Sequence, residues 1–560
     1  MTGVADWPVQ RLLVVPVLLP LATAAVLLLL ADRRRALAAA LSLASAVAGL
    51  GLAIALLWWV DRHDAPAAFG VYLPGNWPVP FGIVLVVDRL SALMMVLAGS
   101  AGVAALAFSL ARWHRAGVHF HPLFQLQLMG LYGAFLTADL FNLFVFFEVL
   151  LAASYGLLMH GGGSDRVRAG LHYIAINLVA SLLFLIGVAL LYGVTGTLNM
   201  ADIAHKLPQV PASDRGLLHA GAAILAIAFL AKAAVWPLNF WLPPAYAAAG
   251  APVAALFAIL TKVGVYALLR LWTLCFPASA GASALFGGGV LAWSGLVTLA
   301  FGAVGMMASQ RLDRLAGFSV IASSGTLLAA IGFDTPGLST GALYYLASST
   351  LAGCALFLLV ELMERARQVE LAPPPDDDDH LPDFLDAEPP RDANLDDEEE
   401  VLIGHALPGA LAFLGLAFLL CTLVVAGLPP LSGFIGKLAM LSALLDAPVG
   451  AAGLAAGRTL FVLLIVSGLL AATALVRVGI RHFWAPAGRP APRLRIVECL
   501  PIGLLLGACI ALVLQGEAAL AYMRATAEAL HQPQHYIGAV LGSRPVTRGG
   551  PVPAAPGAAP

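Results

Sequence analysis

The chain has 560 residues, of which 60% are hydrophobic and 11% are charged, and its formal net charge is −2. A soluble domain carries about a quarter charged residues, so this composition excludes a soluble globular protein. A helix that crosses a bilayer needs about twenty apolar residues, and runs of that length recur through nearly the whole chain. We therefore expect an all-α polytopic membrane protein.

Fourteen apolar runs are candidates for membrane spans. They cover residues 9–31, 36–60, 83–110, 122–138, 140–160, 170–193, 218–236, 252–274, 286–308, 315–332, 338–362, 405–428, 456–480 and 497–520. Prolines interrupt or follow the seventh and twelfth runs, and short half-helices are expected to continue there at 239–250 and 431–446.

The first run is followed by the basic cluster Arg33, Arg34 and Arg35. A signal peptide has its basic residues before the apolar run, so this order favours an uncleaved first span. If the cluster is cytoplasmic, the connections on its side hold seventeen basic residues and those on the other side hold ten. This bias predicts that both termini lie outside the cytoplasm.

The chain contains four lysines, and three of them lie inside apolar runs. These are Lys232 in AILAIAFLAKAAVWP, Lys262 in LFAILTKVGVYALL and Lys437 in GLPPLSGFIGK; Glu148 in FNLFVFFEVLLAAS is the matching acid. An ionisable group in the bilayer costs at least about 2.5–3.5 kcal/mol, which makes it a functional candidate. A desolvated lysine can release its proton whereas an arginine cannot, so this choice indicates proton or ion handling. Structural ion pairs between helices are the alternative.

Two of these lysines lie near predicted helix breaks. Lys232 precedes Pro237 by five residues, and Lys437 follows Gly427, Pro429 and Pro430. A broken helix at membrane depth is tolerated where it lines a wet cavity or is buried in protein. A pair of interrupted helices about two hundred residues apart suggests a duplicated transporter fold with its sites at the breaks.

Residues 371–400 carry thirteen acids and one arginine. Such a segment cannot bury a core, so we expect a disordered cytoplasmic loop, with a docking or ion-concentrating element as the alternative. Residues 521–540 are expected to form a short interfacial helix, and the tail from about 543 is expected to be disordered.

The sequence gives no support for a cofactor. Its five cysteines all lie in apolar runs without a CxxC pair, so they are interpreted as small buried hydrophobes. We find no P-loop and no strand-embedded GxGxxG motif, and no iron–sulfur, zinc or nucleotide site is expected.

Four stretches resemble the antiporter-like proton-translocating family, which includes the large membrane subunits of respiratory complex I. They are FFEVLLAASYGLLMHGGG (146–163), HYIAINLVASLLFLIGVALLYGVTGTLNMADIA (172–204), KAAVWPLNFWLPPAYAAA (232–249) and GLPPLSGFIGK (427–437). The first two stretches and the acidic loop make the chain most similar to the D subunits of the multisubunit monovalent cation/proton antiporters, called Mrp, Pha or Mnh.

The resemblance implies about fourteen helices with two inverted five-helix repeats, in spans 4–8 and 9–13, and broken helices 7 and 12. The expected parts are the first three helices at 1–121, the first repeat at 122–276 and the second repeat at 277–482, which holds the acidic loop 366–404. Helix 14 is expected at 483–520 and a partly disordered tail at 521–560.

The resemblance also implies a relay of protons. Glu148 falls on the family's fifth-span glutamate, and Lys232, Lys262 and Lys437 fall on its seventh-, eighth- and twelfth-span lysines. In the implied mechanism Glu148 biases the charge of Lys232, Lys232 exchanges protons with Lys262, and a hydrated path continues to Lys437.

One span departs from the family pattern. Many members have a histidine where this chain has Ser348, in the eleventh span. Water bridged by Ser348, Ser349, Thr350 and Tyr345 is the expected replacement. His172 and His405, near span ends, are interpreted as interface histidines, with a relay role as the alternative.

The resulting hypothesis is a non-enzymatic transporter subunit in a bacterial inner membrane that exchanges cytoplasmic Na⁺ or K⁺ for protons with other antiporter subunits as partners. A proton-pumping subunit of a complex I-like NADH:quinone oxidoreductase or membrane hydrogenase is the alternative. The expected partners include the lipid bilayer but no nucleic acid.

Overall fold

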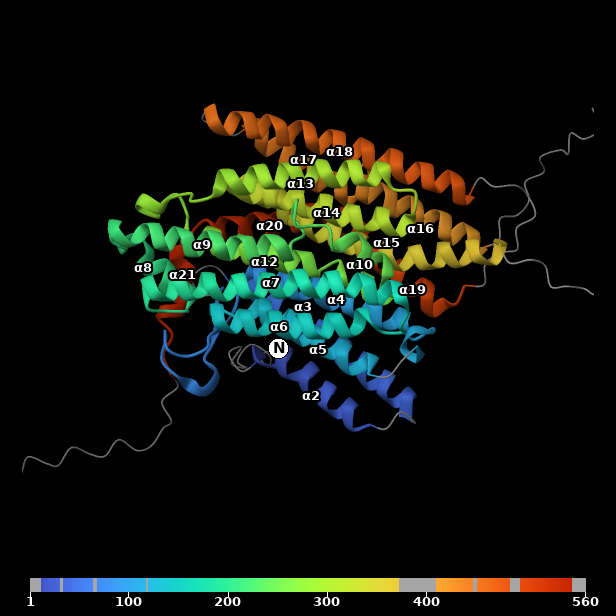
Figure 1. Cartoon of the computed structure of the whole chain (residues 1–560), viewed down its shortest axis with the longest axis horizontal. Coiled ribbons are helices and arrows are strands. Elements are labelled where there is room, and N and C mark those ends of the chain that lie inside the picture. Colours follow the sequence, from blue (N-terminus) through green and yellow to red (C-terminus); the bar gives the residue numbers. More distant parts are fainter. Residues whose placement is uncertain are drawn as a thin grey trace, which may run out of the picture.

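The computed structural model describes residues 12–30, 34–63, 68–116, 119–371, 409–446, 451–483 and 494–545. These residues form one bundle of helices that lie side by side with similar axis directions (Figure 1). The first helices of the chain lie along one edge of the view, the middle of the chain fills the centre, and α13, α17 and α18 lie along the opposite edge.

The N-terminal part contains three long helices and a short hairpin. Its elements are α2 (Val15–Leu29), α3 (Arg35–Asp61), β1 (Gly70–Tyr72), β2 (Leu85–Val87) and α4 (Arg89–Ser109). β1 and β2 pair antiparallel. The predicted third run, 83–110, therefore contains the short strand β2 followed by the helix α4. Asp88 separates the two because its carboxylate accepts the Ser91 backbone N–H at 2.9 Å and caps α4.

The middle part continues the bundle. It comprises α5 (Phe120–Leu136), α6 (Leu140–Leu158), α7 (Ser164–Thr195), α8 (Met200–Lys206), α9 (Ala212–Lys232), α10 (Leu242–Ala248), α11 (Ala251–Phe257) and α12 (Leu260–Cys275). The predicted eighth run is therefore two consecutive helices, α11 and α12, and the sequence analysis did not anticipate the break between them.

The last part contains α13 (Gly288–Ala308), α14 (Leu312–Gly332), α15 (Pro336–Leu371), α16 (Gly409–Ala426), α17 (Ser432–Asp446), α18 (Ala451–Phe483), α19 (Ile496–Leu514), α20 (Gly516–Leu530) and α21 (Pro533–Leu541). Four 3-10 turns connect these elements in the described residues, at Pro74–Asn76, Trp113–Arg115, Leu207–Gln209 and Gly281–Ser283.

Each predicted apolar run overlaps one of these helices or a pair of them. Twelve helical segments of the described residues are long and apolar enough to cross a membrane. α2, with 15 residues, and α5, with 17, are shorter. The fold is that of an all-α polytopic membrane protein, and the count of fourteen spans remains a prediction.

The helices divide into a central and a peripheral set. In an apolar stretch of 18 residues of α11–α12, 94% of the residues are buried inside the bundle, whereas the corresponding share in α19 is 33%. α14 and α15 are also central, with 83% and 89%. The helix that carries Lys262 and those facing it are therefore shielded from the surroundings of the bundle.

Two terminal expectations need adjustment. α15 continues to Leu371, so the first residues of the predicted loop 366–404 are helical, and residues 372–408 lie outside the described residues. Residues 516–541 form two helices instead of one, and they pack onto the bundle: Met523, Ala527 and Val540 are buried. Residues 546–560 of the expected disordered tail lie outside the described residues.

Candidate functional site

The first break in the membrane separates α9 from α10. α9 ends at Lys232, and Pro237 lies in the turn that leads to α10. The last carbonyls of a helix lack intrahelical partners, and here the Trp241 indole donates a hydrogen bond to the Ala231 carbonyl at 3.3 Å. Lys232 therefore lies at the negative end of the α9 dipole, where a cation is favoured.

Lys232 lines a small cavity. Its Nζ lies 5.2 Å from the centre of the Phe147 ring, a cation–π contact. The cavity is also lined by Tyr173, Asn177 and Trp241, and the space open to the centre of a water-sized sphere is about 40 Å³. Water needs roughly 10–15 Å³ by this measure, so the cavity has room for water beside the amine.

Glu148 lies on α6, next to Phe147 in sequence. Its carboxylate accepts a hydrogen bond from the Ser181 hydroxyl of α7. No ion pair within 4.0 Å joins Glu148 and Lys232 in the part of the chain that the structure describes. Both side chains have intermediate exposure.

Lys262 lies three residues after the junction between α11 and α12 that falls at Ile259. It is 1% exposed, and its Nζ donates to the Ser323 hydroxyl of α14 at 2.7 Å. Ser323 in turn donates to the Ser349 hydroxyl of α15 at 3.0 Å. This chain of three polar groups leads from Lys262 across two helices.

Ser323 was missed by the sequence analysis, although a signal was available. Ser319, Ser323 and Thr326 recur at helical spacing in α14, and all three line one cavity together with Lys262. Hydroxyl groups on one face of a central helix mark a polar surface within an apolar bundle.

That cavity connects Lys262 with Lys437. The space open to the centre of a water-sized sphere is about 30 Å³. Its polar lining comprises Lys262, Ser319, Ser323, Thr326, Tyr345, Ser349, Lys437 and Ser467. The structure thus brings two of the predicted lysines to a single polar cavity, which is large enough for one or two waters.

The four predicted relay residues of α15 separate into two pairs. Tyr345 and Ser349 line the cavity. Ser348 instead shares a 2.8 Å hydrogen bond with Ser432 at the start of α17, and the Thr350 hydroxyl donates to the Leu346 carbonyl at 2.7 Å. Ser348 is fully buried, and the partner of its hydroxyl group is Ser432, across the contact between α15 and α17.

The second break separates α16 from α17, and Lys437 lies beyond it on α17. The Lys437 Nζ donates to the carbonyl of Ala426, the last residue of α16, at 2.9 Å. Gly427 has φ +73°, which disfavours other residues, and a Cβ there would lie 2.6 Å from the Lys437 Cδ. The predicted break residues Gly427, Pro429 and Pro430 thus form the turn against which the lysine stem packs.

The two cavities lie on opposite faces of α12. Leu260, Val263 and Gly264 line the Lys232 cavity, whereas Lys262 lines the other. With about 100° of rotation per residue, Lys262 points about 160° away from Leu260 and Gly264 and about 100° away from Val263. A Cβ on Gly264 would lie 2.7 Å from the Phe229 carbonyl, so α12 and α9 are in close contact beside Lys232.

The structure describes one of the two spare histidines, His172, and it lines neither lysine cavity. His172 is exposed on α7, where its Nδ1 is 2.9 Å from the Arg168 carbonyl. His405 lies outside the described residues.

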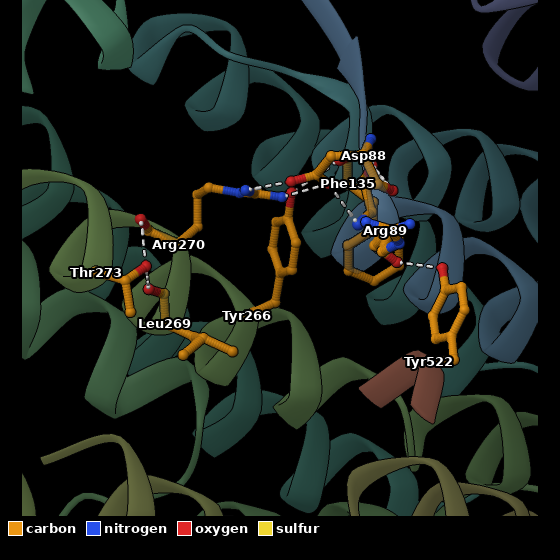
Figure 2. A network of polar contacts seen from close by, with 9 residues as sticks. Asp88, Arg89, Phe135, Tyr266, Leu269, Arg270, Thr273 and Tyr522 are labelled. Carbon is orange, nitrogen blue, oxygen red and sulfur yellow. Dashed lines mark hydrogen bonds and ion pairs between the residues drawn. The ribbon is translucent and has the colours of Figure 1, made fainter. Parts of the chain in front are cut away.

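A buried charge pair, also missed by the sequence analysis, lies beside the C-terminal helices. Arg270 lies within α12 and is 6% exposed. Its two terminal nitrogens donate to the Asp88 carboxylate at 2.6 and 2.7 Å (Figure 2). Burial alone would raise the pKa of Asp88, but the Arg270 charge and the hydrogen bonds bring it below its ordinary value.

The same region holds two tyrosines of the C-terminal helices. The Tyr522 hydroxyl donates to the Arg89 carbonyl at 2.8 Å, and the Tyr536 ring lies 5.1 Å from the Arg270 guanidinium (Figure 2 shows the first). A bidentate, buried pair with these contacts fixes α4, α12 and α20 relative to one another. Its chemistry is structural, because arginine keeps its proton.

Comparison with known proteins agrees with this architecture. Residues 137–463 match the family described as "NADH:quinone oxidoreductase/Mrp antiporter, TM". The chain is 53% identical over 541 residues to the D subunit of a probable K(+)/H(+) antiporter of Rhizobium meliloti, covering 96% of this chain and 98% of that protein. It is 33% identical over 538 residues to the D subunit of an Na(+)/H(+) antiporter of Alkalihalophilus pseudofirmus, covering 95% and 99%.

A solved structure extends the agreement to three dimensions. A chain of the Mrp complex from Dietzia sp. DQ12-45-1b superposes with a TM-score of 0.76 at 27% identity, covering 96% of this chain and 100% of that chain. The chain belongs to the NADH:quinone oxidoreductase/Mrp antiporter membrane family, and within it resembles the antiporter D subunits.

Proposed function

We propose that this chain is the proton-translocating subunit of a multisubunit antiporter that exchanges cytoplasmic monovalent cations for protons. The observation that carries the proposal is the placement of Lys262 and Lys437 on one polar cavity, with Lys232 on a second cavity across α12. Two buried lysines and one half-buried lysine, each beside room for water, are suited to take up and release protons.

The proposed route begins at Lys232, whose charge is biased by Glu148. Lys262 lies on the opposite face of α12, so a proton crosses from one cavity to the other at this helix. The break between α11 and α12, three residues before Lys262, is the point where the backbone deviates from a regular helix.

From Lys262 the route follows hydroxyl groups. Ser323 accepts from Lys262 and donates to Ser349, and a hydroxyl that accepts and donates at once can pass on a proton within a chain. Water in the shared cavity completes the connection to Lys437. These hydroxyls take the place of the histidine that the family commonly has in this span.

The cation is proposed from the relatives. The relative at 53% identity is named a K⁺/H⁺ antiporter subunit and the one at 33% an Na⁺/H⁺ antiporter subunit, so we propose K⁺ as the preferred ion. The family also includes oxidoreductase subunits, but the antiporter relatives match nearly the full length and favour the antiporter over the proton pump.

The test is cation-dependent proton flux in everted vesicles that carry the complete complex. Glu148→Gln removes the charge but keeps an oxygen that accepts from Ser181, and exchange should fall about tenfold or more. Glu517→Gln, an exposed acid at the start of α20, is the matched control and should exchange like the parent. Flux that follows NADH oxidation without K⁺ or Na⁺ would reject the antiporter assignment.

A further inference from the structure

A basic pocket lies away from the lysine cavities, where the first turns of α7 and α14 meet α10. It is much larger than those cavities: the space open to the centre of a water-sized sphere is about 560 Å³. Its lining includes Asp165, Arg168, His172, Phe240, Arg311 and Arg314. The positive-inside prediction puts this end of the molecule at the cytoplasmic surface of the membrane.

The side chains that line the pocket carry more positive than negative charge and have unused donors, although Arg311 also lies in the field of Asp165, Asp313 and Glu364. It is lined by three arginines and one aspartate. Arg311 is paired with Asp313. The guanidinium groups of Arg168 and Arg314 make no hydrogen bond or ion pair with other described residues, although each can donate in a planar fork that fits phosphate oxygens.

An apolar surface begins directly beside these charges. Phe240, in the pocket wall, is 55% exposed. On α7, Val179, Leu182 and Ile186 are exposed, at 51%, 61% and 50%. They follow Arg168 by 11, 14 and 18 residues, which places them on its face of the helix, so an apolar stripe runs from the basic pocket along the membrane-spanning part of α7.

We propose that this pocket binds the phosphate head group of an anionic phospholipid, whose acyl chains lie along the α7 stripe. Arg168 and Arg314 bind the phosphate from two helices, while Phe240 and Val179 contact the chains. A free phosphate would use the arginines alone and leave the apolar stripe uncovered. Basic pockets between helices at the cytoplasmic surface are suited to anionic head groups.

The bound lipid would connect three elements of the bundle. α7 and α14 supply the arginines, and α10, the half-helix after the Lys232 break, supplies Pro244 and Ala247 to the wall. α10 contacts both α7 and α14. The lipid therefore stabilises the half-helix at the first break, and this inference holds whether or not the lysines carry protons.

The experiment uses the complete complex in detergent after removal of co-purified lipid. Its thermal midpoint is measured while phosphatidylglycerol is added, and in parallel with phosphatidylcholine of the same chain length and with inorganic phosphate. A ligand that binds only the folded state raises the midpoint in proportion to its saturation. Phosphatidylglycerol should raise the midpoint at concentrations where the other two do not.

Variants assign the effect to the pocket. Arg168→Gln with Arg314→Gln should require at least about tenfold more phosphatidylglycerol for the same rise, because two charge-assisted contacts are lost. Arg34→Gln with Arg35→Gln removes two exposed charges at the same predicted side of the membrane and should respond like the parent. Arg168→Lys with Arg314→Lys, which keeps the charge, should fall between them.

Three results would overturn the proposal. The first is an equal rise with phosphatidylcholine, which would indicate a general lipid effect. The second is an equal rise with inorganic phosphate, which would indicate a free-anion site. The third is an unchanged phosphatidylglycerol response in the Arg168→Gln and Arg314→Gln protein.

Discussion

The two broken helices meet the same backbone requirement with different side chains. At each break a carbonyl in the last turn of the upstream half-helix accepts a hydrogen bond from a side chain. The Trp241 indole donates to Ala231 at the first break, and the Lys437 ammonium donates to Ala426 at the second. The Ala231 carbonyl also accepts from the Ala234 backbone N–H at 3.2 Å, so a neutral side chain supplements a backbone bond at the first break, whereas a titratable amine is the carbonyl's partner at the second.

This difference separates the two lysines chemically. Lys232 is left without a backbone hydrogen bond in the described structure and faces an aromatic ring and a cavity. Lys437 donates to the Ala426 carbonyl at the end of α16, so its amine has a backbone partner that the Lys232 amine lacks. We infer that Lys232 changes its proton occupancy more readily, whereas Lys437 serves as the end point of the route.

The largest effect is expected at the second break. Lys437→Gln keeps a donor for the Ala426 carbonyl but cannot carry a proton, and Lys437→Ala removes both. Both variants should lose exchange by about 100-fold, the scale of a lost acid–base group. The alanine variant alone should also lose about 1.5–3 kcal/mol of stability through the missing charged hydrogen bond.

The comparison of vesicle flux with the thermal midpoint of the purified complex separates these two roles. Near-parental exchange in Lys437→Gln would mean that the lysine is only a helix cap.

A smaller effect is expected between the two lysines of the shared cavity. Ser349→Leu should fill the cavity and remove the acceptor for Ser323, so exchange per complex should fall about tenfold. Ser348→Leu, the neighbouring control, should lower the amount of folded protein by overpacking that costs about 1–3 kcal/mol. Its exchange per complex should stay near the parent, because Ser348 faces Ser432. The opposite ranking, measured at matched expression, would place the route at Ser348.

At the first break, Trp241→Phe tests the cap alone. The ring remains, and the hydrogen bond to Ala231 is lost, which should cost about 0.5–1.5 kcal/mol of stability. Exchange should change little, because the Ala231 carbonyl keeps its hydrogen bond from the Ala234 backbone N–H. A loss of exchange as large as that of Lys437→Gln would show that both caps belong to the transport machinery.

The smallest effect is expected from the acidic segment, which precedes only the second of the two broken helices. Deleting residues 374–398 should leave exchange near the parent, since changes in loop length cost little free energy in solvent. As the control measurement, the chain is purified through an affinity tag and the other subunits that co-purify with it are quantified. Loss of these subunits with normal expression of the chain would identify the segment as a docking element.

Much of this arrangement was predictable from composition and local pattern. The rarity of lysine drew attention to Lys232, Lys262 and Lys437, and the prolines placed both breaks within a few residues of their observed positions. These features are local, since proline chemistry and bilayer length act along the chain.

What escaped prediction depends on packing between distant segments. The Lys262–Ser323–Ser349 chain joins three helices, and the Asp88–Arg270 pair joins residues that are 182 positions apart. The α11–α12 break contains no proline at its junction, so no local signal marked it. Ser348 was favoured because of a departure from a family pattern, whereas its helical position turns it away from the cavity and towards α17.

The central claim is that the lysine at the first break carries protons and is not only a fixed cation. Lys232→Arg tests this most directly, because arginine keeps the charge and the cation–π contact with Phe147 but stays protonated. Lys206→Arg is the matched control, since Lys206 is 41% exposed on its side chain and pairs with Asp202 at 2.9 Å. K⁺- and Na⁺-dependent proton flux in everted vesicles should be lost in Lys232→Arg and retained in Lys206→Arg at equal assembly. Parental flux in Lys232→Arg would contradict the account and make Lys232 a structural cation.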